Sequence, residues 1–232
     1  MSKTNAFETS FLNHLFNNAI LANVGSGLPA SVTAGSLYLS LHSASPGETA
    51  ADQSINELSY VGYARVATAR ASGVAGWNVS GNSATLGQAT SFGARTDTGV
   101  AVEATFFGIG VGASGATDLL YYGPLVGANS AYDFTGLNTG NTILVPGSAY
   151  SVNDRVVFSL GAESALPTGI ADGQILYIKT ASGTSYTLSS TLGGLEYDIT
   201  VDGAGIVQRL SPITIAQNTT PQLTTGTKVI ED

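Results

Sequence analysis

Between positions 7 and 20, apolar side chains recur every three or four residues, which predicts one amphipathic helix. Its apolar face comprises Phe7, Phe11, Leu12, Leu15, Phe16, Ala19 and Ile20. Asn5 is the expected N-cap, and Glu8, three residues later, would complete a capping box. We expect the helix to end before Gly25, with Pro29 preventing a restart. A short helix of this kind needs a partner surface, which is either its own sheet or a neighbouring subunit.

The chain beyond the helix shows the two-residue alternation of β-strands. In SLYLSLH, residues 36–42, three leucines alternate with Tyr38 and Ser40. Further strands are expected within residues 60–70, 76–81, 82–87, 102–112 and 118–125. Gly, Asn, Asp and Ser separate these segments at short intervals, which is typical of a sandwich or barrel. The helical pattern does not return, so a parallel doubly wound sheet is not expected.

A second region with its own rhythm begins near Leu137. Its expected strands are Arg155–Leu160, Ile175–Thr180, Ser185–Ser189 and Tyr197–Val201, joined by turns that include DGAG at 202–205. The segment from Ser211 onward returns to the style of the first region. The sequence thus predicts a mainly β protein: a β-sandwich or barrel domain with a short N-terminal helix (residues 1–136 plus 210–232), and a second small β domain (residues 137–209) inserted in one of its loops, where insertions cost little.

Composition narrows the classes of function. Charged residues make up only 10% of the 232 residues, against roughly 25% in an average soluble domain. The net charge is −8 and the eight Lys and Arg are scattered, which opposes nucleic-acid binding. A surface of small uncharged residues suits packing against other protein. Cysteine is absent, and no apolar run or signal-peptide pattern is present, so we expect no disulfide, no membrane span and synthesis in the cytoplasm.

One stretch, residues 35–66, concentrates the polar side chains that catalysis could use. They are Ser40, His42, Ser43, Glu48 and Asp52. A hydrolase would need a nucleophile, a base and an orienting acid within hydrogen-bond reach, and no G-x-S-x-G elbow is present. We expect His42 to make a hydrogen bond at the end of a strand, while Pro46, Gly47 and the acidic residues shape a solvated turn. No catalytic residue is predicted.

The remaining candidates also favour structural roles. His14 lies at the border of the helix face, and Asp198 and Asp202 flank a turn, although their oxygens could ligate calcium. The glycines of FFGIGVGASGAT, residues 106–117, lack the spacing and lysine of a phosphate loop and are interpreted as strand and turn. Trp77 is expected to anchor a strand. The tyrosines and phenylalanines could form a carbohydrate-binding surface or pack in cores. No metal or cofactor ligand is predicted.

Two long motifs carry a resemblance. Residues 37–66 contain LYxxLH, PGE, QS and ExxYxGYARV in that order, and residues 211–230 match SPxTIAxxxTPxxxxGxxxI. With the Trp-containing segment at 76–86, they resemble small tailed-phage virion proteins labelled tail fibre or capsid decoration (cement) proteins, over residues 5–126 and 210–232. In the inserted region NDRVVF, LPTGIADGQILYI and SYTLSS are similar to a β module of phage tail and adhesin-like proteins.

The resemblance implies a structural virion protein without enzymatic activity or cofactor. The first hypothesis is a capsid decoration protein, a homotrimer that binds the lattice of the major capsid protein on the outer surface of the virion and stabilises it by mass action. The alternative is a tail fibre or tail-adaptor component that contacts the host, with the insert binding a surface glycan. Neither nucleic acid nor membrane is an expected partner. A hydrolase is disfavoured, because no carboxylate pair lies on a recognisable scaffold.

Overall fold

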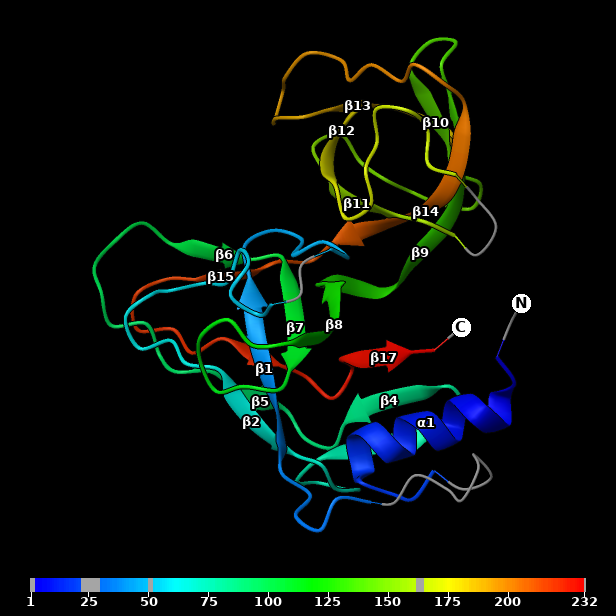
Figure 1. Ribbon diagram of the computed structural model, residues 1–232. Coiled ribbons are helices and arrows are strands. Elements are labelled where there is room, and N and C mark those ends of the chain that lie inside the picture. The colour runs from blue at the N-terminus through cyan, green and yellow to red at the C-terminus, as the bar shows by residue number, and fades with distance from the viewer. Residues whose placement is uncertain (1–2, 22–29, 50–51, 162–164, 232) are drawn as a thin grey trace. The chain divides into compact units, whose positions relative to one another are not determined.

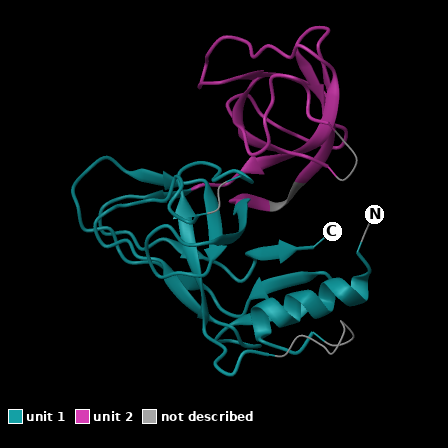
Figure 2. Cartoon of the chain, viewed as in Figure 1, with its two compact units in different colours: residues 1–123, 213–232 teal, residues 124–212 magenta. Residues whose placement is uncertain are grey.

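The structure is a computed structural model that describes residues 3–21, 30–49, 52–161 and 165–231. It is mainly β with one helix, α1 (Asn5–Asn17), which confirms the predicted fold class. The chain forms two compact units, shown in Figure 2: unit 1 contains residues 1–123 and 213–232, and unit 2 contains residues 124–212. Among the described residues, no helix has the length and apolar character needed to cross a bilayer.

Unit 1 is built from several small antiparallel sheets rather than from one barrel. A four-stranded sheet has the order β2 (Val66–Ala69), β1 (Ser36–His42), β7 (Phe106–Gly110) and β8 (Leu119–Pro124). A three-stranded sheet has the order β17 (Lys228–Ile230), β4 (Ser83–Leu86) and β3 (Trp77–Ser80). Two pairs complete the unit: β15 (Ile213–Ile215) with β6 (Val102–Ala104), and β16 (Gln222–Leu223) with β5 (Thr90–Ser91).

The segment after unit 2 is an integral part of unit 1. Each of its three strands, β15, β16 and β17, pairs with a strand from the first half of the chain in a different sheet. The closing sequence motif, residues 211–230, therefore supplies the strands that cover edges of β6, β5 and β4, which would otherwise be unpaired.

Helix α1 packs on its own unit, which is one of the two predicted alternatives. Leu12 and Phe16 are fully buried, and the Phe16 ring lies 4.5 Å from the Trp77 ring, centroid to centroid. Figure 1 shows α1 alongside β4. The N-cap is Thr4 and not Asn5: the Thr4 hydroxyl accepts a hydrogen bond from the Phe7 amide at 3.4 Å.

The C-terminal end of α1 comes earlier than Gly25. Asn18 adopts the left-handed conformation with φ of 53°, and its backbone amide donates a hydrogen bond to the Asn13 carbonyl, which ends the helix. Gly25 and Pro29, which the sequence assigns to the helix end, lie outside the described residues.

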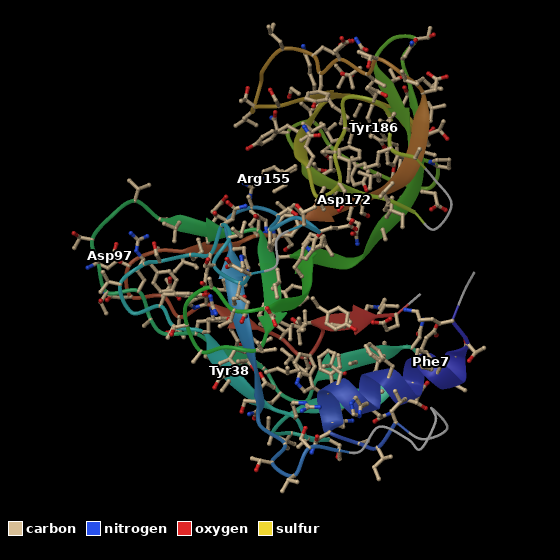
Figure 3. All side chains as sticks on the ribbon, viewed as in Figure 1. Phe7, Tyr38, Asp97, Arg155, Asp172 and Tyr186 are labelled. Carbon is tan, nitrogen blue, oxygen red and sulfur yellow. The ribbon has the colours of Figure 1, made fainter. Side chains whose placement is uncertain are left out.

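Unit 2 is a closed barrel of six strands around one hydrophobic core. Its order is β10 (Thr142–Leu144), β13 (Ser185–Ser189), β12 (Ile175–Ser182), β11 (Arg155–Ser159), β14 (Gly203–Leu210) and β9 (Val126–Leu137). Tyr186, labelled in Figure 3, lies inside the barrel together with Phe134, Phe158 and other buried apolar residues. Polar hydroxyls are satisfied internally: the Tyr150 hydroxyl donates to the Val207 carbonyl at 3.2 Å.

The borders of unit 2 differ from the predicted 137–209. Strand β9 pairs along most of its length with β14, so residues 126–137 belong to the barrel, and unit 2 as a whole runs from Pro124 to Pro212. Residues 197–201 form no strand; Val201 makes only an isolated bridge with Thr168.

The DGAG sequence is also not a turn, because β14 begins at Gly203. A Cβ atom at Gly203 would lie 2.5 Å from the Pro167 nitrogen, and one at Gly205 would lie 2.7 Å from the Ser159 carbonyl oxygen. Glycine is needed in this strand because other backbone crosses it closely.

Candidate functional site

The polar residues of the motif at 37–66 converge on one buried cluster in unit 1, here called the motif network. It comprises Ser40, His42, Gln53, Glu57, Tyr63, Arg65 and Thr117. Strand β1 supplies the first two, and the loop that joins β1 to β2 supplies the next four. Thr117 comes from the connection between β7 and β8. The network therefore fastens a long loop against two strands and their connection.

Arg65 is the centre of the motif network. Its guanidinium donates two hydrogen bonds to the Glu57 carboxylate, from Nε to Oε1 and from Nη2 to Oε2, both at 2.7 Å. It also donates to the carbonyl oxygens of Gly112 at 3.1 Å and Gly115 at 2.8 Å, and to Thr117 Oγ1 at 2.9 Å. The Glu57 hydrogen bonds raise the pKa of Arg65. Such bidentate, charge-assisted pairs are stronger than neutral hydrogen bonds and fix geometry.

Gln53 joins the ion pair to the sheet. Its side chain is fully buried, and its Nε2 donates to the Tyr38 carbonyl at 2.9 Å. Its Oε1 accepts from Arg65 Nη1 at 3.3 Å and from Thr117 Oγ1 at 3.1 Å. The Gln53 amide group thus uses both its donor and its acceptor inside the protein, as a buried polar group must.

Tyr63 links the ion pair to the backbone of β1. Its hydroxyl donates to Glu57 Oε1 at 2.9 Å and accepts from the Leu41 amide at 3.0 Å. Burial raises the pKa of Tyr63, so the phenol stays protonated and keeps its donor role.

Ser40 and His42 form a hydrogen bond of the type that activates a nucleophile, but inside the core. Ser40 Oγ lies 2.8 Å from His42 Nε2, and His42 Nδ1 lies 2.8 Å from the Ile55 carbonyl oxygen. Because that carbonyl can only accept, Nδ1 carries the proton and Nε2 accepts from Ser40. Both side chains are fully buried, which gives a substrate no access to the serine. The predicted hydrogen bond at the end of the strand is the one to Ile55.

Burial also governs the charge of His42. Burial lowers the pKa of His42, because an imidazolium in the core would be poorly solvated. The neutral ring then serves as one donor and one acceptor between β1 and the loop, which is the arrangement observed.

The glycines of FFGIGVG create the space for this network. A Cβ at Gly108 would lie 2.6 Å from Ser40 Oγ and 2.7 Å from His42 Nε2. At Gly110 it would lie 2.1 Å from the Gln53 side-chain carbonyl carbon. Strand β7 thus carries glycine where the motif network lies against it, in agreement with the predicted strand.

The other candidates of this stretch make local contacts. Glu48 is exposed, and Ser43 Oγ donates to the Asn56 carbonyl at 3.2 Å. Asp52 Oδ1 accepts from the amide and from the hydroxyl of Ser54, each at 2.6 Å, and these bonds lower the pKa of Asp52. None of these residues joins the motif network.

The histidine and aspartates outside the stretch also have structural contacts. His14 Nδ1 lies 2.8 Å from the Ala19 carbonyl oxygen, beyond the end of α1. Asp202 Oδ1 accepts from the Asn138 amide at 2.8 Å, and Asp198 is exposed. Within the described part of the chain, no group of three or more His, Asp or Glu residues is arranged to hold a metal ion.

A second ionic anchor, absent from the sequence-based predictions, holds the closing motif. Arg95 is buried and binds Asp97 through Nε at 3.0 Å, which holds the pKa of Asp97 at about 2. Its Nη1 donates to the carbonyls of Val100 at 2.7 Å and Ile215 at 3.1 Å. The chain has few basic residues, so an arginine that lies between apolar segments is a sequence signal for a buried ion pair. This signal could have identified both Arg65 and Arg95 as anchors.

Comparison with known proteins identifies a family for the first part of the chain. The family model described as podophage GP4 fiber I protein gp80 matches residues 2–136, which include α1 and every member of the motif network. No curated protein and no solved structure matches the chain. Because the match covers more than half of the sequence, the protein belongs to the podophage GP4 fibre I protein gp80 family.

Proposed function

We propose that this protein is a non-enzymatic structural component of a podophage tail fibre, carried on the outside of the virion. The family supports a phage fibre component. It gives no support to the first hypothesis, capsid decoration, and favours the alternative of a tail fibre. Lattice binding is therefore not retained in the proposal.

The observation that carries the proposal is that the polar side chains of the motif bond to one another inside unit 1 and not to an outside ligand site. Arg65, Glu57, Gln53 and Tyr63 bind one another and the backbone, and the Ser40–His42 pair is closed off from solvent. Polar groups that are satisfied by one another in a core fix a fold and leave nothing free for a substrate. The part of the chain shared with the family is, in this proposal, a scaffold.

Unit 2 is the proposed host-contacting part, with a surface glycan as its ligand. Apart from residues 124–136 it lies beyond the family match, so its role need not be that of the whole family. The segment between β13 and β14 exposes Leu192 and Leu195, the latter 89% exposed. Exposed apolar side chains that the barrel core does not use support a contact surface.

Particle composition tests the fibre assignment. Quantitative mass spectrometry of purified virions should give a copy number far below that of the major capsid protein, and antibody labelling should mark the tail. A copy number comparable to the capsid subunits, with label over the shell, would contradict it.

Adsorption tests the role of unit 2. The purified protein should compete with phage for host cells, and a variant without unit 2 should not. Incubation with host polysaccharide should release no sugar. Sugar release that is lost on mutation of acidic residues would show an enzyme instead.

A further inference from the structure

The apolar face of α1 is wider than the surface that covers it. Leu12 and Phe16 are fully buried, but Phe11 and Leu15 are only half-buried and Phe7 is 41% exposed. The rings of Phe7 and Phe11 stack on each other with centroids 6.2 Å apart. Figure 3 labels Phe7 at the first turn of α1. The side of the helix that bears Phe7 and Phe11 therefore offers apolar surface to a further partner.

Glu8, on the same side of the helix, lacks a partner for its charge. The residue is only 5% exposed, and its side chain makes no hydrogen bond or ion pair with any described residue. Its place in the first helical turn compensates only part of the cost of burying a carboxylate. Arg65 and Arg95, the buried cations of the same unit, are both paired.

The carboxylate oxygens of Glu8 are not both fully enclosed, although the residue as a whole is only 5% exposed. The side-chain polar atoms that are fully enclosed without a partner, among the described residues, are Thr68 Oγ1 and Trp77 Nε1, and the Glu8 oxygens are not among them. A cation from another molecule could therefore approach Glu8 while an apolar neighbour covers Phe7 and Phe11.

The outer face of β17 offers that combination. Lys228 is exposed and has no ion pair with a described residue, and Ile230, two positions on, is 47% exposed. Lys228 and Ile230 pair with Thr85 and Ser83 of β4, so these four side chains share one face of the sheet. Val229 points to the opposite face, where it is buried.

Helix α1 lies on that opposite face. Its Phe16 contacts Trp77, which pairs with Leu86 and so shares a face with Ala84 and Val229. The surface around Glu8 and the surface around Lys228 are thus on opposite sides of the β17-β4-β3 sheet. Within one copy of the chain they do not meet.

We infer that the Glu8 surface (Phe7, Glu8 and Phe11) of one copy binds the Lys228 surface (Lys228 and Ile230) of a second copy, with Lys228 donating to the Glu8 carboxylate. Because the two surfaces differ, the contact is head-to-tail, and repetition closes a ring when the rotation permits. The inference concerns the isolated protein and does not rest on the proposed function.

Sedimentation velocity of the full chain over a concentration series tests the contact. The unmodified protein should associate. Glu8→Gln and Lys228→Gln should each raise the dissociation constant by at least about 30-fold, since each leaves one charge of a covered pair alone. Lys179→Gln is the matched control, because Lys179, on unit 2, also lacks an ion pair with a described residue, and it should have no effect.

The sign of the stability change separates this contact from a purely internal role of Glu8. At concentrations where the chain is monomeric, Glu8→Gln should raise the unfolding midpoint observed by Trp77 fluorescence, because an unpaired buried charge is removed. The double variant Glu8→Lys with Lys228→Glu should regain association. A protein that stays monomeric at every concentration, or a Lys228→Gln variant that associates like Lys179→Gln, would overturn the inference.

Discussion

Replacing Arg65 with methionine tests whether the motif network holds unit 1 together. Methionine keeps an unbranched apolar side chain in place of the arginine stem but removes all six hydrogen bonds of the guanidinium. The Glu57 carboxylate, whose side chain is only 14% exposed, then loses its ionic partner, and the carbonyl oxygens of Gly112 and Gly115 each lose a hydrogen bond. Breaking a buried ion pair by removing one partner costs about 3–5 kcal/mol.

The single tryptophan makes this loss measurable in one unit. Trp77 is fully buried in unit 1 and unit 2 has no tryptophan, so its fluorescence reports the unfolding of unit 1. With a urea slope of about 2 kcal/mol/M, the midpoint should fall by about 1.5–2.5 M. Domains are stable by only about 5–15 kcal/mol, so a loss of this size is a large fraction of the stability of unit 1.

Two control variants accompany Arg65→Met. Adding Glu57→Gln to Arg65→Met should cost less than the sum of the single changes, because the two residues act on the same pair. Arg209→Met removes an exposed pair with Asp154 in unit 2 and should leave the Trp77 transition unchanged. An Arg65→Met midpoint within about 0.5 M of the unmodified protein would show that the motif network does not support the fold.

Three further outcomes are expected. Burial lowers the pKa of His42, so below pH 6.5 the unfolded chain binds a proton that the folded chain does not. The free energy of unfolding followed by Trp77 fluorescence should therefore decrease between about pH 7 and pH 5.5, by up to about 1.4 kcal/mol per pH unit. The decrease should be smaller in His42→Asn. Gly108→Ala should lower the thermal midpoint, at a cost of about 1–3 kcal/mol, whereas Gly127→Ala, which meets no atom within 4 Å, should not. Removing residues 126–210 and joining the ends by a short turn should leave the Trp77 transition in place, because the Ser211 amide already bonds the Leu125 carbonyl at 2.7 Å; a collapsed transition would show that unit 1 needs unit 2.

Local periodicity was enough to locate the elements whose side chains alternate cleanly. Strand β1 has the predicted limits, 36–42, because three leucines face one side and the polar positions face the other. The spacing also predicts the apolar face of α1. It predicts Asn5 as the cap where the structure has Thr4, since both residue types are good caps. Strands β9 and β14 contain glycines and polar residues that look like turns, and only their mutual pairing in the barrel makes them strands.

The contacts of the motif network could not be predicted from the sequence. Gln53, Glu57 and Arg65 have the side chains of surface residues, and nothing in their spacing brings them to Thr117, which is 52 residues from Arg65 and 64 from Gln53. A motif that sets charged residues at fixed places in a chain with 10% charged residues is the sequence-level sign of a special role. That sign cannot distinguish a core network from an active site, because the difference lies in burial.

The division of unit 1 between both ends of the chain has a consequence for biosynthesis. Unit 2 is continuous in sequence and can fold while the ribosome is still translating the last strands of unit 1, whereas β4, β5 and β6 must wait for the strands at 213–230. A chain that ends before those residues would leave one edge each of β4, β5 and β6 unpaired. Such fragments would be degraded or would aggregate, so incomplete chains would be excluded from assembly.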